Sequence, residues 1–227
     1  NFKSKILNTN LKFKFDINNK KLKVYNLYLR NKNISFSAES LIILRPFLDF
    51  NSKFDVENIN LNIFKKIDID NLLKHKNFIK QINSKNEINY NPKKFSKNYI
   101  NDLNLKLDFG YGRINYLKKF SISKTFFQCK GNLNLLEEYP LIFFDCTIIS
   151  ANKKKFLKVF SIKTKKSGNL NLKINGNLNI KNKKINFKNI MVNDAKATKE
   201  DLRFYKDAFE KTLLKKSLNE IFSIKSI

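Results

Sequence analysis

The sequence lacks tryptophan, and its 227 residues include only five glycines, three prolines, two cysteines and one histidine. Two cysteines are too few for a disulfide framework or for a zinc site of several thiolates. No glycine-rich phosphate loop and no nucleophile elbow is present. The single histidine, His75, lies between two lysines, which indicates a solvated side chain. We therefore expect no catalytic residues, no metal and no cofactor.

Long hydrophobic runs are also missing. No stretch of about 18 apolar residues predicts a transmembrane helix, and no signal peptide is recognisable. The chain begins with Asn1 rather than Met, so we interpret residues 1–227 as one segment of a longer protein. A membrane anchor or an export signal would then lie outside it. Wholesale disorder is excluded by an apolar content of 42% with 22 phenylalanines.

Acidic residues are scarce: 19 Asp and Glu stand against 46 Lys and Arg, for a net charge of +27. Such a charge is typical of proteins that bind nucleic acid or an anionic membrane surface. It is equally expected from AT-rich codons, which favour Lys, Asn, Ile and Phe. The lysines are spread over the polar positions of most predicted strands, and no Arg cluster occurs. A functional and a compositional origin of the charge both stay open. Because no Arg cluster occurs, we expect no nucleic-acid partner.

What the sequence does contain is a repeated hairpin. Residues 15–29 and 178–192 align without a gap, and each has alternating apolar residues on both sides of an Asn-Lys pair. Two-residue turns at Asn19-Lys20 and Asn182-Lys183 would place the large apolar side chains of each hairpin on one face. The predicted opposite pairs are Ile17 with Leu22, Phe15 with Val24, Ile180 with Ile185, Leu178 with Phe187, and Ile174 with Met191.

The longest predicted strand covers residues 170–180. The dipeptide Asn175-Gly176 is typical of a hairpin turn, but a turn there would set apolar residues opposite polar ones throughout. An uninterrupted strand keeps the even-numbered apolar residues on one face for about 36 Å, with Gly176 at a bend or bulge. This length indicates a broad sheet with one apolar face.

The other elements follow from periodicity. Alternation predicts strands near 11–17, 22–29, 34–38, 56–63, 103–109 and 127–135, with a slip between Val56 and Ile59. Residues 41–48 and 141–149 are apolar at both parities, and the second range predicts a strand covered on both sides. A helix is predicted over 67–82, a polar loop that is the weakest part of the domain over 83–98, and a closing helix over about 198–219. Thr198 and Asp201 have the spacing of a capping box.

The two cysteines flank a predicted hairpin. Cys129 lies opposite Cys146 if the loop is 136–139, and opposite Thr147 if the loop is one residue longer. Buried free thiols are favoured over a disulfide, which would need an oxidising compartment. Asp145 interrupts an apolar strand and needs a partner or water, for which a structural role suffices.

Three segments resemble the AsmA-like family of Gram-negative envelope proteins, which includes TamB and YhdP. They are the strand, corner and return strand over 37–63, the long strand 168–180 with its partner 184–192, and the helix after Thr198. Each consists of alternation plus one or two turn residues, and together they cover about half of the chain. The predicted helix near Leu72 and the loop to Asn98 have no counterpart.

The resemblance implies a single segment over 1–227, mainly β, in which a long, curved antiparallel sheet forms a groove or open half-barrel with one internal helix and a C-terminal helix. It implies a periplasmic protein anchored to the inner membrane, which takes part in phospholipid transport or outer-membrane biogenesis and possesses outer-membrane protein partners. The groove floor would bind phospholipid acyl chains. The residues expected on that floor are Leu103, Leu105, Leu107, Phe109, Leu133, Leu135, Leu170, Leu172, Ile174, Leu178, Ile180, Ile185 and Phe187.

Two alternatives compete with a lipid-binding groove. In the first, a second sheet from the same chain closes the apolar face, and the protein is a β-sandwich scaffold or interaction module without lipid cargo. In the second, the chain is a basic nucleic-acid binder, but exposed aromatic residues interleaved with Arg are absent. The three hypotheses differ in what covers the apolar face of the sheet.

Overall fold

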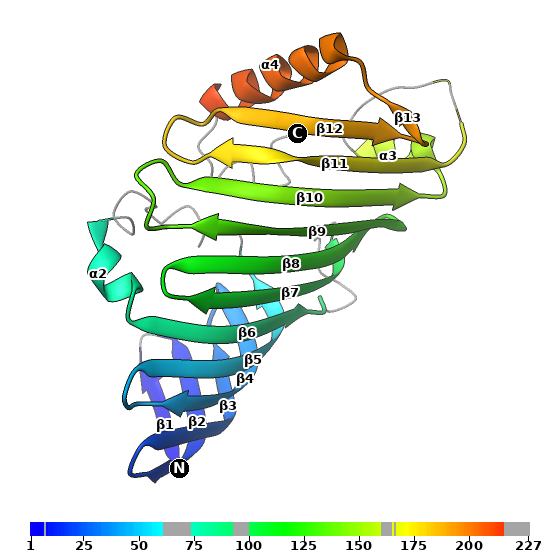
Figure 1. The fold of residues 1–227 in the computed structure, drawn as a ribbon. Helices are drawn as coiled ribbons and strands as arrows, with labels where there is room; N and C mark the ends of the chain where they lie inside the picture. Colours follow the sequence, from blue (N-terminus) through cyan, green and yellow to red (C-terminus); the bar gives the residue numbers. More distant parts are fainter. Residues whose placement is uncertain (7, 61–73, 93–99, 160–164, 166, 216–227) are drawn as a thin grey trace.

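The structure, a computed structural model, describes residues 1–6, 8–60, 74–92, 100–159, 165 and 167–215. They form one sheet of thirteen strands, in which each strand pairs with its neighbours along the sequence. The sheet is curled but not closed into a barrel. Its N-terminal strands lie at a steep angle behind the later ones (Figure 1). The mainly-β, curved and open sheet is thus confirmed.

The N-terminal part of the sheet contains six strands: β1 (Phe2–Ile6), β2 (Thr9–Asn18), β3 (Lys21–Arg30), β4 (Ile34–Ile43), β5 (Leu48–Ile59) and β6 (Ile82–Tyr90). The C-terminal part contains seven: β7 (Ile100–Gly110), β8 (Arg113–Ile122), β9 (Thr125–Asn134), β10 (Leu141–Ser150), β11 (Leu170–Asn179), β12 (Ile185–Val192) and β13 (Ala195–Lys196). The described helices are α2 (Lys76–Ile79), α3 (Lys153–Val159) and α4 (Lys199–Lys215).

Strand β6 corrects the sequence-based expectation. Residues 83–98 were expected in a loop, but residues 83–90 belong to a strand that pairs parallel to β5 and antiparallel to β7. Residues 93–98 lie outside the described chain. The polar side chains that obscure its alternation find partners on the neighbouring strands. Asn89 donates to Asp55 of β5 at 3.0 Å, and Asn104 of β7 donates to Glu87 at 2.8 Å. The loop prediction was wrong here because these partners are remote in sequence.

The two repeated hairpins differ in outcome. In β2–β3, Ile17 pairs with Leu22 as predicted. In β11–β12, the pairing is displaced by two residues, so that Leu178 pairs with Ile185. The cause is a wider turn: the side-chain oxygen of Asn179 accepts hydrogen bonds from the backbone N–H groups of Lys181 and Asn182. A displacement by two residues leaves Leu178 and Ile185 on the predicted face. Beyond the shift at Gly176, Ile174 pairs with Ile190, so the predicted pair of Ile174 with Met191 was wrong and Met191 lies on the opposite face.

Two predicted irregularities are present. The ladder between β4 and β5 shifts next to Ser35 and Phe36, opposite the slip expected between Val56 and Ile59. Strand β11 is continuous, and its pairing with β12 shifts at Asn175/Gly176. The turn at Asn175-Gly176 was therefore correctly rejected, and the glycine lies at a bulge.

The helices lie at the margins of the sheet. Within the range 67–82 that was predicted as one helix, the structure has the short helix α2 at residues 76–79; residues 67–73 lie outside the described residues, and Ile82 begins β6. Helix α4 begins after Thr198 with the predicted capping box, in which the Asp201 carboxylate accepts the Thr198 N–H at 2.9 Å. Residues 216–219 of the predicted closing helix lie outside the described chain.

Helix α4 lies along β12, at the C-terminal edge of the sheet (Figure 1). The Glu210 carboxylate accepts a hydrogen bond of 2.9 Å from the backbone N–H of Ile185. An edge strand with unpaired N–H groups invites pairing with other chains. Helix α4 therefore protects this edge, whereas no described element covers the N-terminal edge at β1.

Candidate functional site

One side of the sheet is apolar across twelve strands. We define the apolar face as the side chains that the register places on the same side as Leu103, Leu105, Leu107 and Phe109 of β7; the opposite side is the polar face. Residues that are opposite one another in a ladder share a face. The apolar face includes, in the other strands, Phe13, Leu22, Phe36, Phe54, Ile88, Phe120, Phe127, Phe144, Leu172 and Ile190.

The structure brings all thirteen residues predicted for the groove floor onto this face. Eleven lie within strands β7 to β12 at matching register positions. The other two, Leu135 and Ile180, directly follow β9 and β11 and are buried. Their backbone N–H groups bond to Gly112 and Pro140, which fixes them beside the neighbouring turns.

Five of the thirteen pack into small cores at the two ends of the strands. At one end, Leu170 and Leu172 pack with Phe156 of α3. At the other end, Phe109, Leu133 and Leu135 pack with Ile79 of α2. These five residues, together with the buried Ile180 and Ile185, therefore stabilise the fold, and the part of the face that a ligand could occupy lies between the two cores.

A row of alternating aromatic and glycine residues crosses this central region. The register aligns Tyr116, Gly131, Phe144, Gly176 and Phe187 on five consecutive strands. A Cβ atom on Gly131 would overlap the Phe143 carbonyl oxygen, and a Cβ on Gly176 would overlap that of Asn186. The glycines thus leave room for the rings beside them, an arrangement known to stabilise glycine positions in sheets.

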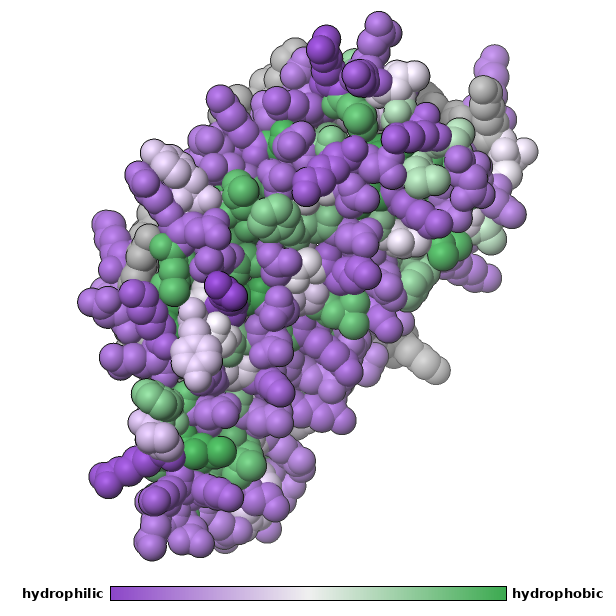
Figure 2. All heavy atoms as spheres, in the orientation of Figure 1, coloured by the Kyte–Doolittle hydropathy of each residue, from purple (hydrophilic) through white to green (hydrophobic). Residues whose placement is uncertain are grey.

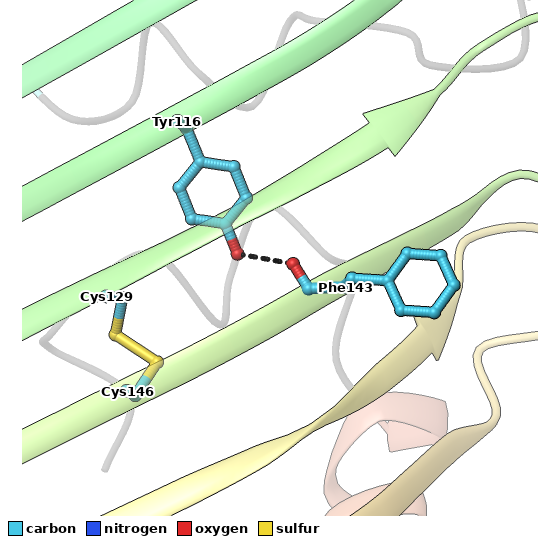
Figure 3. The surroundings of a disulfide bond; sticks show 4 residues. All are labelled: Tyr116, Cys129, Phe143 and Cys146. Atoms are coloured by element: carbon cyan, nitrogen blue, oxygen red, sulfur yellow. Dashed lines mark hydrogen bonds between the residues drawn. A yellow bond between two sulfur atoms is a disulfide. The ribbon is translucent and has the colours of Figure 1, made fainter.

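The Tyr116 side chain reaches across Gly131 to β10, where its hydroxyl donates to the Phe143 carbonyl oxygen at 3.0 Å (Figure 3). Burial raises the pKa of the Tyr116 phenol above its ordinary value. The phenol therefore stays protonated, and remains a donor, at neutral pH.

The adjacent row contains the two cysteines. Cys129 pairs directly with Cys146, as expected for the shorter loop, and the two form a disulfide between β9 and β10 (Figure 3). The prediction of buried free thiols was therefore wrong. Spacing along the chain shows only that the two residues can meet, whereas bond formation requires both sulfurs on the same face of neighbouring strands.

The same row contains a lysine that the sequence analysis missed. Lys118 pairs with Leu105 on one side and with Cys129 on the other, so its side chain belongs to the apolar face. Its ammonium lies over the Phe120 ring, 4.7 Å from the centroid. Burial lowers the pKa of Lys118 below its ordinary value. The sequence did contain a signal for this residue: Lys118 lies between Tyr116 and Phe120, at the parity of the apolar residues.

A small polar patch interrupts the apolar face near the parallel pair of strands. Ser40 and Ser52 share a hydrogen bond of 2.7 Å, and Asn86 donates to Ser84 at 2.9 Å. Ser52 and Ser84 are buried, with 6% and 4% exposure. These side chains satisfy one another, so the patch is a stable part of the face.

The face is most open at its N-terminal end. Phe15 is 43% and Ile17 68% exposed, and the rings of Phe2 and Phe13 lie 5.0 Å apart. Contiguous exposed apolar side chains of this kind mark surfaces that contact other molecules. The apolar face thus extends from small closed cores in β7–β12 to an open surface in β1–β2.

The polar face carries most of the charge. Asp145 lies there, with its carboxylate 3.7 Å from the Lys130 ammonium and half exposed, which agrees with a structural role. Ile149, on the same face, is 49% exposed, so the prediction that β10 is covered on both sides was wrong. The side of the molecule seen in Figure 2 is mostly hydrophilic, with separate hydrophobic areas between the polar side chains.

Within the described part of the chain, no group of three or more His, Cys, Asp or Glu residues could hold a metal ion. None of the helices described has the length and the hydropathy needed to cross a membrane. Comparisons with protein-family models, with curated proteins and with solved structures found no match for this chain.

Proposed function

We propose that this chain is a lipid-binding groove segment of a periplasmic, inner-membrane-anchored AsmA-like protein, and that it takes part in phospholipid transport or outer-membrane biogenesis. The observation that carries the proposal is the one-sided sheet: twelve consecutive strands contribute to a single apolar face. The described strands form no second sheet that would close this face as a sandwich does.

Acyl chains suit such a face because they need no specific polar contacts. Burial of each methylene contributes roughly 0.8 kcal/mol, so a chain of about 15 methylenes gains roughly 12 kcal/mol before the entropy of ordering is subtracted. Between the two small cores, the apolar face offers aromatic and aliphatic side chains from β7 to β12. This composition agrees with ligands that are bound by burial.

The cross-strand disulfide supports the envelope location. Disulfides persist in oxidising compartments such as the periplasm and are rare in the reducing cytosol. Cys129 and Cys146 pair within one sheet, so the bond is part of the folded domain. A structural disulfide of this kind is expected in an exported protein.

The proposal is tested by extracting the purified chain with organic solvent and identifying bound lipids by mass spectrometry. Phospholipid should co-purify with the wild type. Leu107→Asp, on the apolar face between the two cores, should abolish loading while the circular dichroism spectrum stays unchanged. Leu117→Asp, in the adjacent strand but on the polar face, is the matched control and should keep its lipid. An empty wild-type protein, or equal loading of both variants, would contradict the proposal.

A further inference from the structure

Lys118 is the only charged residue that the described strands place on the apolar face. The chain carries 46 Lys and Arg residues. In every ladder from β1 to β13, the other Lys, Arg, Asp and Glu positions fall on the polar face. General lysine enrichment accounts for charge on the solvated side of the sheet. It does not account for this position.

The Lys118 ammonium has few partners. On the neighbouring strands it faces Leu105 and the disulfide-bonded Cys129. The Phe120 ring supplies a cation–π contact. Among the described residues, no carboxylate forms an ion pair with Lys118. A partly buried ammonium without a counter-charge is unfavourable unless an anion or water compensates it.

The Lys118 ammonium cannot avoid this desolvation by reaching the polar turns at the ends of the strand. Lys118 is the sixth of the ten residues of β8, which spans Arg113–Ile122. Each end of the strand is therefore roughly 13–16 Å away at about 3.3 Å per residue. That distance exceeds the reach of a lysine side chain, which snorkels only over its own four-carbon stem. The charge is held in the middle of the face.

We infer that Lys118 binds the carboxylate of a long-chain fatty acid whose hydrocarbon chain lies on the apolar face. This inference rests on the proposed lipid-binding function and adds free fatty acids, as a further class of lipid, to the phospholipids proposed above. A carboxylate is a compact single charge that one ammonium can neutralise through a charge-assisted hydrogen bond. A phosphodiester carries further polar groups, and the described side chains next to Lys118 on the apolar face offer no additional free donor: the Tyr116 hydroxyl already donates to Phe143.

The test compares oleate with oleyl alcohol, which has the same hydrocarbon chain and no charge, in a fluorescence displacement assay at about pH 8, where the carboxylate is ionised. The proteins are the wild type, Lys118→Met, Lys118→Arg and Lys119→Met. Lys119 neighbours Lys118 but lies on the polar face, so Lys119→Met is the matched control. Vesicles of dioleoylphosphatidylglycerol are a third ligand.

The wild type and Lys119→Met should bind oleate about tenfold more tightly than oleyl alcohol. Lys118→Met should lose this preference and keep its affinity for the alcohol, while Lys118→Arg should retain it. If wild type and Lys118→Met bind both ligands equally, the carboxylate site is refuted and the lipid-binding function stands. A Lys118-dependent preference for phosphatidylglycerol over oleate also refutes it. If no ligand binds to the wild type, the proposed function itself fails.

Discussion

The Tyr116 hydroxyl donates a hydrogen bond to the main-chain carbonyl of Phe143 across an intervening strand, at 3.0 Å. The two residues are 27 positions apart, and the bond links β8 to β10 over Gly131 of β9. Most contacts between strands in this sheet join direct neighbours. This one links three consecutive strands across Gly131.

Removing this hydroxyl tests its contribution to stability. Tyr116→Phe leaves the ring in place and removes one partly buried hydrogen bond. We expect the free energy of unfolding to fall by about 1 kcal/mol, the typical net contribution of such a bond. Urea denaturation of both proteins measures the difference. A variant as stable as the wild type would show that water replaces the hydroxyl without cost.

Gly131 is expected to tolerate no side chain. In Gly131→Ala the new methyl would overlap the Phe143 carbonyl oxygen and crowd the Tyr116 hydroxyl. Overpacking of this kind destabilises by roughly 1–3 kcal/mol. Gly110→Ala is the matched control, because its Cβ would meet only the Asn83 side chain, at an ordinary 3.5 Å. Thermal unfolding of the two variants should separate them clearly, and similar midpoints would contradict the close packing over Gly131.

The disulfide should contribute to stability through the unfolded chain. The Cys129–Cys146 bond closes a loop with a sequence separation of 17, and a loop of about that size corresponds to roughly 3 kcal/mol. Reduction with dithiothreitol, or the double substitution Cys129→Ala with Cys146→Ala, should lower the urea midpoint accordingly. Mass spectrometry of the alkylated protein first establishes that the bond is present. An unchanged midpoint after complete reduction would contradict this prediction.

Lys118 should destabilise the ligand-free protein. Burial lowers its pKa in the folded state, so the unfolded chain binds this proton more tightly. The resulting loss in the free energy of unfolding is complete at pH values below the lowered pKa. It disappears as the pH rises toward the ordinary pKa of 10.5. Lys118→Met should therefore be more stable than the wild type at neutral pH, by about 1 kcal/mol or more.

The pH dependence separates this effect from packing. The gain from Lys118→Met, measured by urea denaturation, should shrink as pH increases from neutral toward about 10. Leu105 and Cys129, which flank Lys118 across the ladder, do not titrate, and Tyr116 on the same strand is present in both proteins. A gain that is constant with pH would mean that the methionine merely packs better.

Several features of this chain could be predicted without coordinates. The alternation in residues 103–109, 127–135, 170–180 and 185–192 placed the thirteen proposed floor residues on one face, because successive side chains of a strand point to opposite sides. The capping box at Thr198 and Asp201 located the start of α4, since it depends on residues three positions apart. These are local patterns, and local backbone geometry decides them.

Other features depended on partners far along the sequence. Strand β6 could not be recognised, because its polar residues are satisfied by Asp55 and Asn104 on strands whose proximity only the fold establishes. The two-residue shift of the β11–β12 register arose from hydrogen bonds to one side chain, that of Asn179. The disulfide required Cys129 and Cys146 on one face in neighbouring strands.

By itself, the sequence determined that this protein is built of strands with one apolar side, because the two-residue repeat of the pleat admits no other arrangement of so regular an alternation. Only the tertiary structure decided that the strands join into one continuous sheet and that small cores around α2 and α3 form at the two ends of its C-terminal strands. It also decided that Lys118 is the one charged residue of the described strands on the apolar face. Those outcomes depend on pairing between distant segments, where packing and hydrogen bonds across strands outweigh local preference.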